Sequence, residues 1–152
     1  MLADIIERAV DDIGPRSVAV RVPAGLPEVT ADPELMERVV VNLARNALRY
    51  SPPGSLPLLT ARAHGGRVEL CVIDRGPGIP AAERDRAFLP FQRLGDTSTT
   101  PGVGLGLTLS RTLTEAMGGL LEPHETPGGG LTMVISLPAA RKSVSAPGGR
   151  AR

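Results

Sequence analysis

The sequence predicts an α+β fold in which helices cover one face of a β-sheet. Two long segments have the apolar spacing of amphipathic helices, and two pairs of apolar segments are joined by glycine-rich turns typical of β-hairpins. The elements follow in the order helix, strand, helix, hairpin, short helix, loop, helix, hairpin. Interleaved helices and hairpins of this kind pack as a two-layer sandwich. At 152 residues the chain is long enough for one domain with its own core.

The elements of the first half follow from apolar spacing. Residues 2–13 repeat apolar side chains every three or four positions, which predicts a short amphipathic helix. Residues 17–22 alternate as a strand does. Asp32 before Pro33 is a typical helix start. The apolar stripe that follows predicts a helix that ends at the Ser-Pro-Pro-Gly sequence after Tyr50.

The second half contains both predicted hairpins. Its predicted elements are a hairpin over 56–74, a short helix within 76–88, a polar loop over 90–104, a long helix over 104–117 and a hairpin over 120–138. From 139 onward the chain is rich in Ala, Gly, Pro, Ser and Arg and poor in larger apolar residues. We therefore expect a disordered tail over 139–152.

The composition narrows the classes of partner. The formal net charge is +1, acidic and basic residues are interspersed, and only 2% of the residues are aromatic. Nucleic-acid binding usually needs a basic surface and aromatic stacking platforms, so no nucleic-acid partner is expected. The chain has no apolar stretch as long as a membrane span and no secretory signal, and its single Cys71 cannot form an internal disulfide. These features predict a cytoplasmic domain without direct membrane contact.

Three alternating glycines, Gly102, Gly104 and Gly106, precede the last long helix. Glycine lets backbone N–H groups approach phosphate oxygens, and a helix N-terminus carries partial positive charge. The spacing fits neither the dinucleotide-binding motif nor the P-loop. A phosphate cradle and a flexible loop that caps a helix both remain possible interpretations of this stretch alone.

Two further stretches place polar groups in otherwise apolar elements, where a ligand-binding role is one explanation. Asn42 and Asn46 lie one turn apart on the same helix face, with Arg45 and Arg49 nearby. An Asn carbonyl is a neutral ligand for Mg²⁺ and Arg binds phosphate, but the same pattern fits a solvated polar face. Asp74 ends an apolar strand before two glycines, where it can accept from an exocyclic amine, although an ordinary turn has the same pattern.

Four motifs occur in order along the chain: NLARNALRYS, DRGPGIP, FLPFQR and GVGLGL. Together they resemble the N, G1, F and G2 boxes of the catalytic domain of bacterial sensor histidine kinases, which belong to a wider ATP-binding group with gyrase and MutL. The resemblance covers nearly all of residues 2–138. It implies a Bergerat-type fold, which is a two-layer sandwich with a mixed, mostly antiparallel sheet covered on one face by helices. Residues 1–138 would form the catalytic domain.

The resemblance implies ATP and Mg²⁺ as cofactors. By position, Asn46 corresponds to the Mg²⁺ ligand, Asn42 to a helper one turn earlier and Arg49 to a residue that reaches phosphate. Asp74 corresponds to the acceptor of the adenine amino group. The F box (Phe88, Phe91 and Arg93) corresponds to the anchor of a mobile lid at 94–101. The cofactor-binding residues are then Tyr50, Asp74, Gly76, Gly78, Ile79, Arg93, Gly102, Gly104, Leu105 and Gly106.

The sequence departs from the wider group at two points. The lid LGDTSTTP has no Lys or Arg, so Mg²⁺, Arg93, Arg45 and Arg49 are expected to neutralise the phosphate charge. Asn42 stands where the relatives that hydrolyse ATP have a Glu that activates water. Because an amide takes no proton at neutral pH, water attack should be slow and the γ-phosphoryl group reserved for another acceptor.

That acceptor is not expected within this chain. The phosphorylated histidine of these kinases lies in a helical dimerisation domain upstream, whereas His64 and His124 are both predicted in hairpin turns. The resemblance therefore implies two partners: the dimerisation domain of the same parent protein, and a response regulator. The parent is expected to be anchored in the inner membrane. The stretch PGVGLGLTLSRTLTEAMGG and the ending TPGGGLTMVISLP most resemble the Kdp-type, potassium-responsive sensors.

Two alternatives stay open at this level. A stand-alone Ser/Thr kinase of the anti-sigma type shares the fold, although the F box argues against it. A module that senses ATP without transferring phosphate would also keep Asn46, Asp74 and the glycines.

Overall fold

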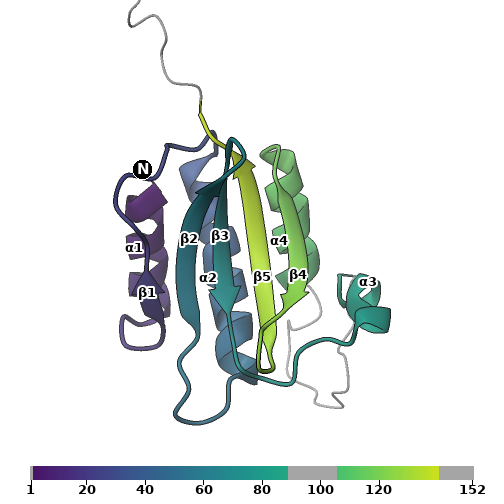
Figure 1. The fold of residues 1–152 in the computed structure, drawn as a ribbon. Coiled ribbons are helices and arrows are strands. Elements are labelled where there is room, and N and C mark those ends of the chain that lie inside the picture. Colours follow the sequence, from purple (N-terminus) through teal and green to yellow (C-terminus); the bar gives the residue numbers. More distant parts are fainter. Residues whose placement is uncertain (1, 89–105, 141–152) are drawn as a thin grey trace, which may run out of the picture.

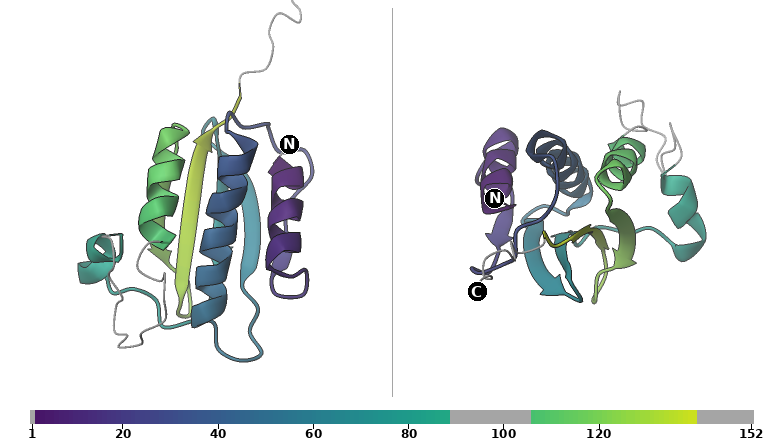
Figure 2. Two further views of the ribbon diagram at one scale, coloured as in Figure 1. Left: turned by 180° about the vertical axis from the view of Figure 1, so that it is seen from behind. Right: turned by 90° about the horizontal axis from the view of Figure 1, so that it is seen from above.

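The computed structural model describes residues 2–88 and 106–140. Its strands form one sheet in the order β1-β2-β3-β5-β4, in which β1 runs parallel to β2 and the other neighbours are antiparallel. Figures 1 and 2 show helices α1, α2 and α4 side by side on one face of this sheet. The predicted α+β sandwich with a mixed, mostly antiparallel sheet is confirmed.

The bounds of the elements agree well with the apolar patterns. The helices are α1 (Leu2–Ile13), α2 (Pro33–Tyr50), the one-turn η1 (Ala81–Glu83), α3 (Arg84–Ala87) and α4 (Gly106–Ala116). The strands are β1 (Ala19–Arg21), β2 (Leu58–His64), β3 (Arg67–Ile73), β4 (Leu120–Glu125) and β5 (Leu131–Pro138).

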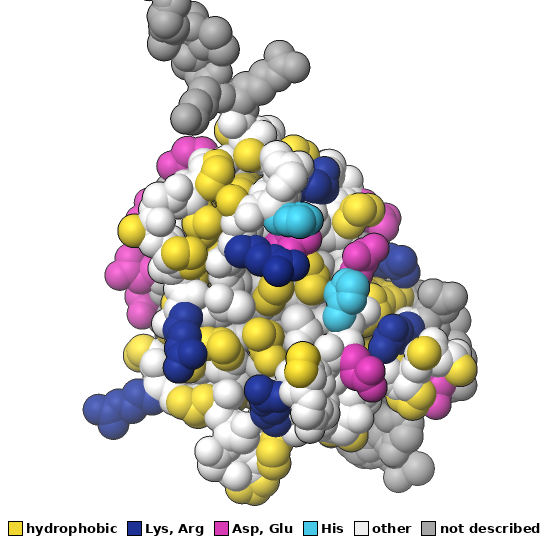
Figure 3. Space-filling view, viewed as in Figure 1, with side chains coloured by type: hydrophobic (Ala, Val, Ile, Leu, Met, Phe, Trp, Pro, Cys, Tyr) yellow, Lys and Arg dark blue, Asp and Glu magenta, His cyan; other side chains and the backbone are white. Residues whose placement is uncertain are grey.

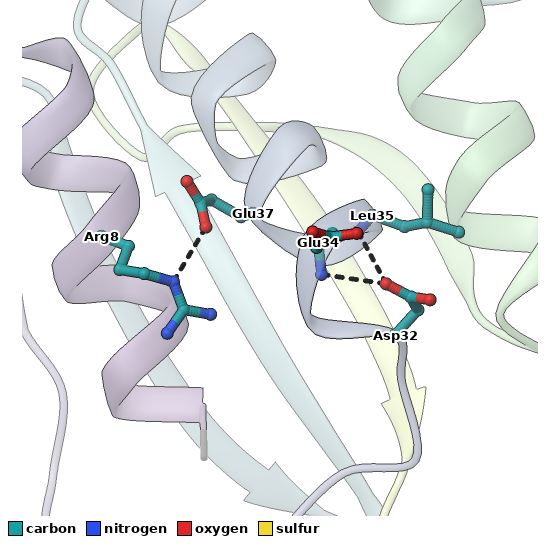
Figure 4. Close-up of polar contacts among 5 residues, drawn as sticks. All are labelled: Arg8, Asp32, Glu34, Leu35 and Glu37. Carbon is teal, nitrogen blue, oxygen red and sulfur yellow. Dashed lines mark hydrogen bonds and ion pairs between the residues drawn. The ribbon is translucent and has the colours of Figure 1, made fainter.

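The residues at the two ends of helix α2 explain where the helix begins and ends. Asp32 Oδ1 accepts hydrogen bonds from the N–H groups of Glu34 (2.9 Å) and Leu35 (3.1 Å), as Figure 4 shows. Pro33 fills the first turn, where a missing N–H removes no helical hydrogen bond. At the other end Ser51 has extended backbone, as expected of a residue that precedes a proline. The helix that carries Asn42, Asn46 and Arg49 is therefore fixed at both ends.

Two ion pairs connect α1 to α2 on the solvent side. Arg8 Nε lies 2.9 Å from Glu37 Oε1 (Figure 4), and Arg45 Nη2 lies 3.6 Å from Asp12 Oδ2. All four side chains are substantially exposed, so each pair contributes at most about 1 kcal/mol to stability. Apolar packing between the helices and the sheet must therefore hold the layers together.

The core lies between the sheet and the helices. Strands β3 and β5 alternate buried and half-buried residues, so each presents every second side chain to the helices. The fully buried large side chains come from α1, α2 and four of the strands: Ile5, Met36, Val39, Val40, Leu43, Leu59, Val68, Leu70, Leu121, Met133, Ile135 and Leu137. The opposite face of the sheet, seen in Figure 3, mixes apolar side chains with scattered arginines, carboxylates and both histidines.

The structure refines the predicted boundaries. The strand predicted over 17–22 pairs only at Ala19–Arg21, because it lies at the edge of the sheet beside β2 alone. His124 lies within β4 and not in a turn as predicted. Ala139 and Ala140 donate hydrogen bonds to the carbonyls of Gly66 (3.0 Å) and Glu28 (2.7 Å), so the paired chain continues past position 138. Most of the predicted tail, residues 141–152, lies outside the described residues.

Candidate functional site

Asp74 is the most constrained polar residue of the site. It directly follows β3, and only 3% of its surface is exposed. Its Oδ1 atom accepts hydrogen bonds from the N–H groups of Gly76 (2.8 Å) and Leu131 (3.2 Å). Within the described residues no hydrogen bond reaches Oδ2. The carboxyl group therefore has one oxygen held by backbone and one oxygen open to a ligand donor.

The electrostatics of Asp74 combine two opposing effects. Burial raises the pKa of its carboxyl group, because desolvation disfavours the charged form. The two N–H donors, from Gly76 and Leu131, act in the opposite direction because they stabilise the carboxylate. The pKa remains above the usual Asp range, as is common for a carboxyl group at a binding site.

Glycines beside Asp74 allow three backbone segments to meet. A Cβ atom on Gly76 would lie 2.2 Å from the carbonyl oxygen of Tyr50, at the end of α2. Gly78 has a φ of +75°, and a Cβ there would lie 3.1 Å from the carbonyl oxygen of Gly130. Because real Cβ atoms do not approach backbone oxygen to 2.2 Å, position 76 requires glycine. The two predicted G1 glycines thus let the segment after β3 lie against α2 and the β4–β5 turn.

Two residues of this site, Gly130 and Thr126, are not among those predicted from the sequence. Gly130 has a φ of +120°, and its Cβ would lie 2.0 Å from the carbonyl oxygen of Asp74. Thr126 is buried, and its hydroxyl donates to that same carbonyl (3.2 Å) and lies 2.9 Å from the Thr132 hydroxyl. The run of three glycines was a usable signal for Gly130, because a hairpin turn rarely needs so many. Nothing local marked Thr126.

The polar residues of α2 separate into two groups. Asn42 and Asn46 are half-buried one turn apart, and Nδ2 of Asn42 is buried with no hydrogen-bond partner in the part of the chain that the structure describes. Arg45 and Arg49 are exposed. Arg45 pairs with Asp12 of α1, and this position does not support the phosphate contact that we expected of it. Arg49 has no ion pair within the described residues.

A groove of about 530 Å³ lies between α1 and α2, and Asn42 is at its edge. Its lining also includes Asp12, Glu37, Arg38 and Arg45, but neither Asp74 nor any glycine of the predicted site. It lacks both an adenine acceptor and a phosphate cradle. We therefore place the candidate site at Asp74 and not in this groove.

The end of α3 is bound to the beginning of α4. The hydroxyl of Thr108 donates to the carbonyl oxygen of Phe88, and the Arg111 guanidinium lies 4.5 Å from the centre of the Phe88 ring. The first F-box residue is thereby held beside the helix that Gly106 begins. The predicted residues Phe91, Arg93, Gly102, Gly104 and Leu105 and the lid at 94–101 lie outside the described residues. Tyr50 and Ile79 are half-buried near Gly76 and Gly78.

This chain belongs to the family described as histidine kinase-, DNA gyrase B-, and HSP90-like ATPase, whose model matches residues 31–141. It is 49% identical over 152 residues to the sensor protein KdpD of Rathayibacter rathayi, an alignment that covers 96% of this chain and 18% of that protein. The chain therefore spans less than a fifth of the length of that relative.

Solved structures agree with this assignment. The mycobacterial sensor histidine kinase MprB superposes with a TM-score of 0.81 at 28% identity, over 93% of this chain and 97% of that one. Full-length ShkA in complex with AMPPNP superposes with a TM-score of 0.77 at 29% identity, over 93% of this chain and 31% of that one. A histidine-kinase-type ATP-binding catalytic domain, similar to that of Kdp-type sensors, is thus confirmed. No described helix is long and apolar enough to span a bilayer.

Proposed function

We propose that this chain binds Mg-ATP and transfers the γ-phosphoryl group to a histidine on a separate helical dimerisation domain, for relay to a response regulator. The observation that carries the proposal is the setting of Asp74. One carboxylate oxygen is held by two backbone N–H groups, and the other has no hydrogen-bond partner within the described residues, beside glycines that bring three backbone segments together. Such an oxygen can accept a hydrogen bond from the exocyclic amine of an adenine ring.

The nucleotide would lie between Asp74 and the C-terminal half of α2. Tyr50 and Ile79 are the half-buried apolar residues nearest the glycines, so they supply packing for the base. Arg49 reaches toward the phosphates from the last turn of α2. By family resemblance, Arg93, Gly102, Gly104, Leu105 and Gly106 complete the phosphate side. Gly106 begins α4, whose N-terminus attracts an anion.

Magnesium fits the amide pair of α2. Among the described residues no group of three or more His, Cys, Asp and Glu side chains could hold a metal ion alone. Asn46 offers a neutral carbonyl oxygen, and the unpartnered Nδ2 of Asn42 can donate to a phosphate oxygen or a water. This donor set suits an ion held mainly by phosphates and waters. When bound, Mg²⁺ would neutralise charge on the β- and γ-phosphates.

Transfer to another domain is favoured over hydrolysis. Asn42 supplies no base for a water molecule, because an amide does not accept a proton at neutral pH. By family resemblance the phosphorylated histidine lies in a helix, whereas His64 lies at the end of β2 and His124 within the edge strand β4. The nucleophile must therefore come from a different domain, which the much longer relatives have room for.

The parent protein is proposed to be a potassium-responsive sensor of the Kdp type, anchored in the inner membrane with this domain in the cytoplasm. Support comes from the 49% identity to a KdpD protein. An anti-sigma-type Ser/Thr kinase and an ATP-sensing module without transferase activity are the alternatives, and both predict the same pocket.

One experiment separates the three functions. The chain would be mixed with Mg²⁺, γ-radiolabelled ATP and the histidine-containing dimerisation domain of a Kdp-type relative. Label on the partner's histidine, stable to base and lost in acid, supports the proposal. Label on Ser or Thr supports the anti-sigma alternative, and nucleotide binding without label supports the ATP-sensing one. A dimerisation domain with its histidine changed to glutamine is the control.

A further inference from the structure

A second cavity, whose lining does not include Asp74, lies at the edge of the sheet formed by β4. Within the described residues β4 pairs with β5 alone, and Figures 1 and 2 show α3 beyond β4 on that side. The cavity is about 300 Å³ and is lined by 121–124 of β4 and by Arg84, Phe88 and Arg111. This volume is enough for two or three side chains of a short peptide segment.

The floor of this cavity is apolar and its wall is cationic. Phe88 is 6% and Leu121 2% exposed, so both are already packed against the core. The Arg111 guanidinium stacks on the Phe88 ring at 4.5 Å from its centre. Nε of Arg84 is buried and has no hydrogen-bond partner in the described chain. A buried guanidinium N–H group without an acceptor destabilises the folded chain, so a ligand that brings an acceptor to Arg84 Nε would be favoured.

The charges around the cavity favour an anionic group at Arg84. The Arg111 guanidinium is 3.5 Å from Glu115, and the His124 imidazole is 3.4 Å from Glu122, so each of these side chains has an acidic neighbour. Arg84 is the one cation of the lining that has no acidic partner within the described residues. A carboxylate is the acceptor that a guanidinium binds most strongly among protein groups.

The backbone of β4 offers hydrogen bonds in the same place. The N–H group of Thr126 donates to the carbonyl of Gly130, so the backbone groups of Thr126 face β5. Every second residue of the strand has the same direction, so the backbone groups of His124 and Glu122 face β5 as well. The intervening residues Leu121 and Pro123 therefore point theirs outward. Pro123 agrees with this alternation, because proline in a strand lies where its nitrogen faces away from the sheet. Within the described residues, Leu121 N–H and the Leu121 and Pro123 carbonyls have no strand partner and could pair with another strand.

We propose that this cavity, which we call the β4–α3 trough, binds an extended acidic segment of a partner protein. The segment would add to the sheet by pairing with Leu121 and Pro123 and place a carboxylate on Arg84. Its apolar side chains would lie on Phe88. Main-chain pairing of this kind supplies affinity, and the pocket beside the edge supplies specificity for an acidic residue.

The test is an NMR titration of the full chain with two peptides, acetyl-Val-Glu-Val-Glu-Val-amide and its counterpart with Gln in place of both Glu residues. The Glu peptide should shift the Leu121 amide and the Arg84 Nε signal saturably and slow hydrogen exchange at Leu121. The Gln peptide should bind at least about tenfold more weakly, because a charged hydrogen bond is lost. No nucleotide is needed, so the result does not depend on the proposed kinase activity.

Two variants test whether Arg84 binds the carboxylate of the peptide. Arg84→Gln should weaken the Glu peptide by about tenfold, the loss expected for one charged hydrogen bond. Arg38→Gln, the same charge change on the exposed face of α2, should leave binding unchanged. If Arg84→Gln fails to fold, the two peptides compared on the unaltered chain decide alone. Equal affinity for both peptides would overturn the proposal, and so would inorganic phosphate shifting Arg84 while the peptides leave Leu121 unmoved.

Discussion

At the scale of single residues, the two carboxylate oxygens of Asp74 differ in their hydrogen bonds. Oδ1 holds the turn after β3 and the start of β5, while Oδ2 is available for a ligand. Asp74→Asn keeps the shape but replaces one oxygen by an NH₂ group, which donates and cannot accept, so either the backbone N–H groups or the exocyclic amine lose their acceptor. ATP affinity should fall by about 1.5 to 3 kcal/mol, the loss of one charged hydrogen bond. Calorimetry that finds unchanged affinity would show that Asp74 does not contact adenine.

The raised pKa of Asp74 also predicts a pH dependence of stability. The folded chain binds this proton more tightly than the unfolded chain, so the carboxyl group favours folding most below the ordinary Asp pKa. That contribution is lost as pH rises through the raised pKa. The free energy of unfolding of the unaltered chain, measured against Asp74→Asn, should therefore increase as pH falls from neutral toward about 4. Denaturant titrations of both proteins at several pH values would check this, and a difference that decreases with falling pH would contradict it.

Gly130 and Gly129 form a matched pair within one turn. Both have positive φ, but a Cβ on Gly129 meets no atom within 4 Å, whereas one on Gly130 would lie 2.0 Å from Asp74 O. Gly129→Ala should cost about 1 kcal/mol of strain. Gly130→Ala should lower the free energy of unfolding by at least about 2 kcal/mol more, because the turn must move away from Asp74. Equal thermal denaturation of the two variants would mean that the turn relaxes without disturbing the site.

At the scale of elements, α2 connects stability to the site. Asp32→Ala removes the acceptor for the N–H groups of Glu34 and Leu35 and should destabilise the chain by about 1 kcal/mol. Asp11→Ala removes a similar exposed charge in α1, where no cap is lost, and should change stability by less than about 0.5 kcal/mol. ATP affinity should remain close to normal in both variants, since Asn46 and Arg49 lie at the opposite end of α2. Chemical denaturation combined with calorimetry separates the two effects.

The elements were largely predictable because their signals are local. The Asp-Pro start of α2, its apolar stripe and the Ser-Pro-Pro-Gly end are all within the helix itself. The strand predicted over 17–22 is longer than the observed β1, because the number of paired residues depends on where the strand lies in the sheet. That position is not visible in the local sequence. Thr126 could not be found, since its contact with Asp74 joins residues 52 positions apart and leaves no periodic pattern. Asn42 and Asn46 were placed correctly on one face, but the pairing of Arg45 with Asp12 required knowing where α1 packs.

At the scale of the whole molecule, the proposed function puts the nucleotide pocket and the phosphate acceptor in different domains. We propose that Asp74, Asn42, Asn46 and the first residue of α4 suffice for nucleotide binding. Phosphoryl transfer also needs a nucleophile in line with the γ-phosphate. Both histidines lie on strands of the sheet, His64 at the β2–β3 turn and His124 in the edge strand. Neither is in a helix like the one that carries the phosphorylated histidine of the related kinases, so we expect the acceptor to come from another domain.

The isolated chain should therefore bind Mg-ATP yet neither label itself nor release phosphate appreciably. Hydrolysis requires water activation, and Asn42 provides no base. Asn42→Glu should raise the rate of phosphate release if a carboxylate at this helix position reaches the attacking water, while Asn42→Gln, which adds the same length without a base, should not. Phosphate release and retained radiolabel would be measured together. Stable label on the unaltered chain would disprove the external acceptor, and its location at His64 or His124 would identify the strand residue that acts as nucleophile.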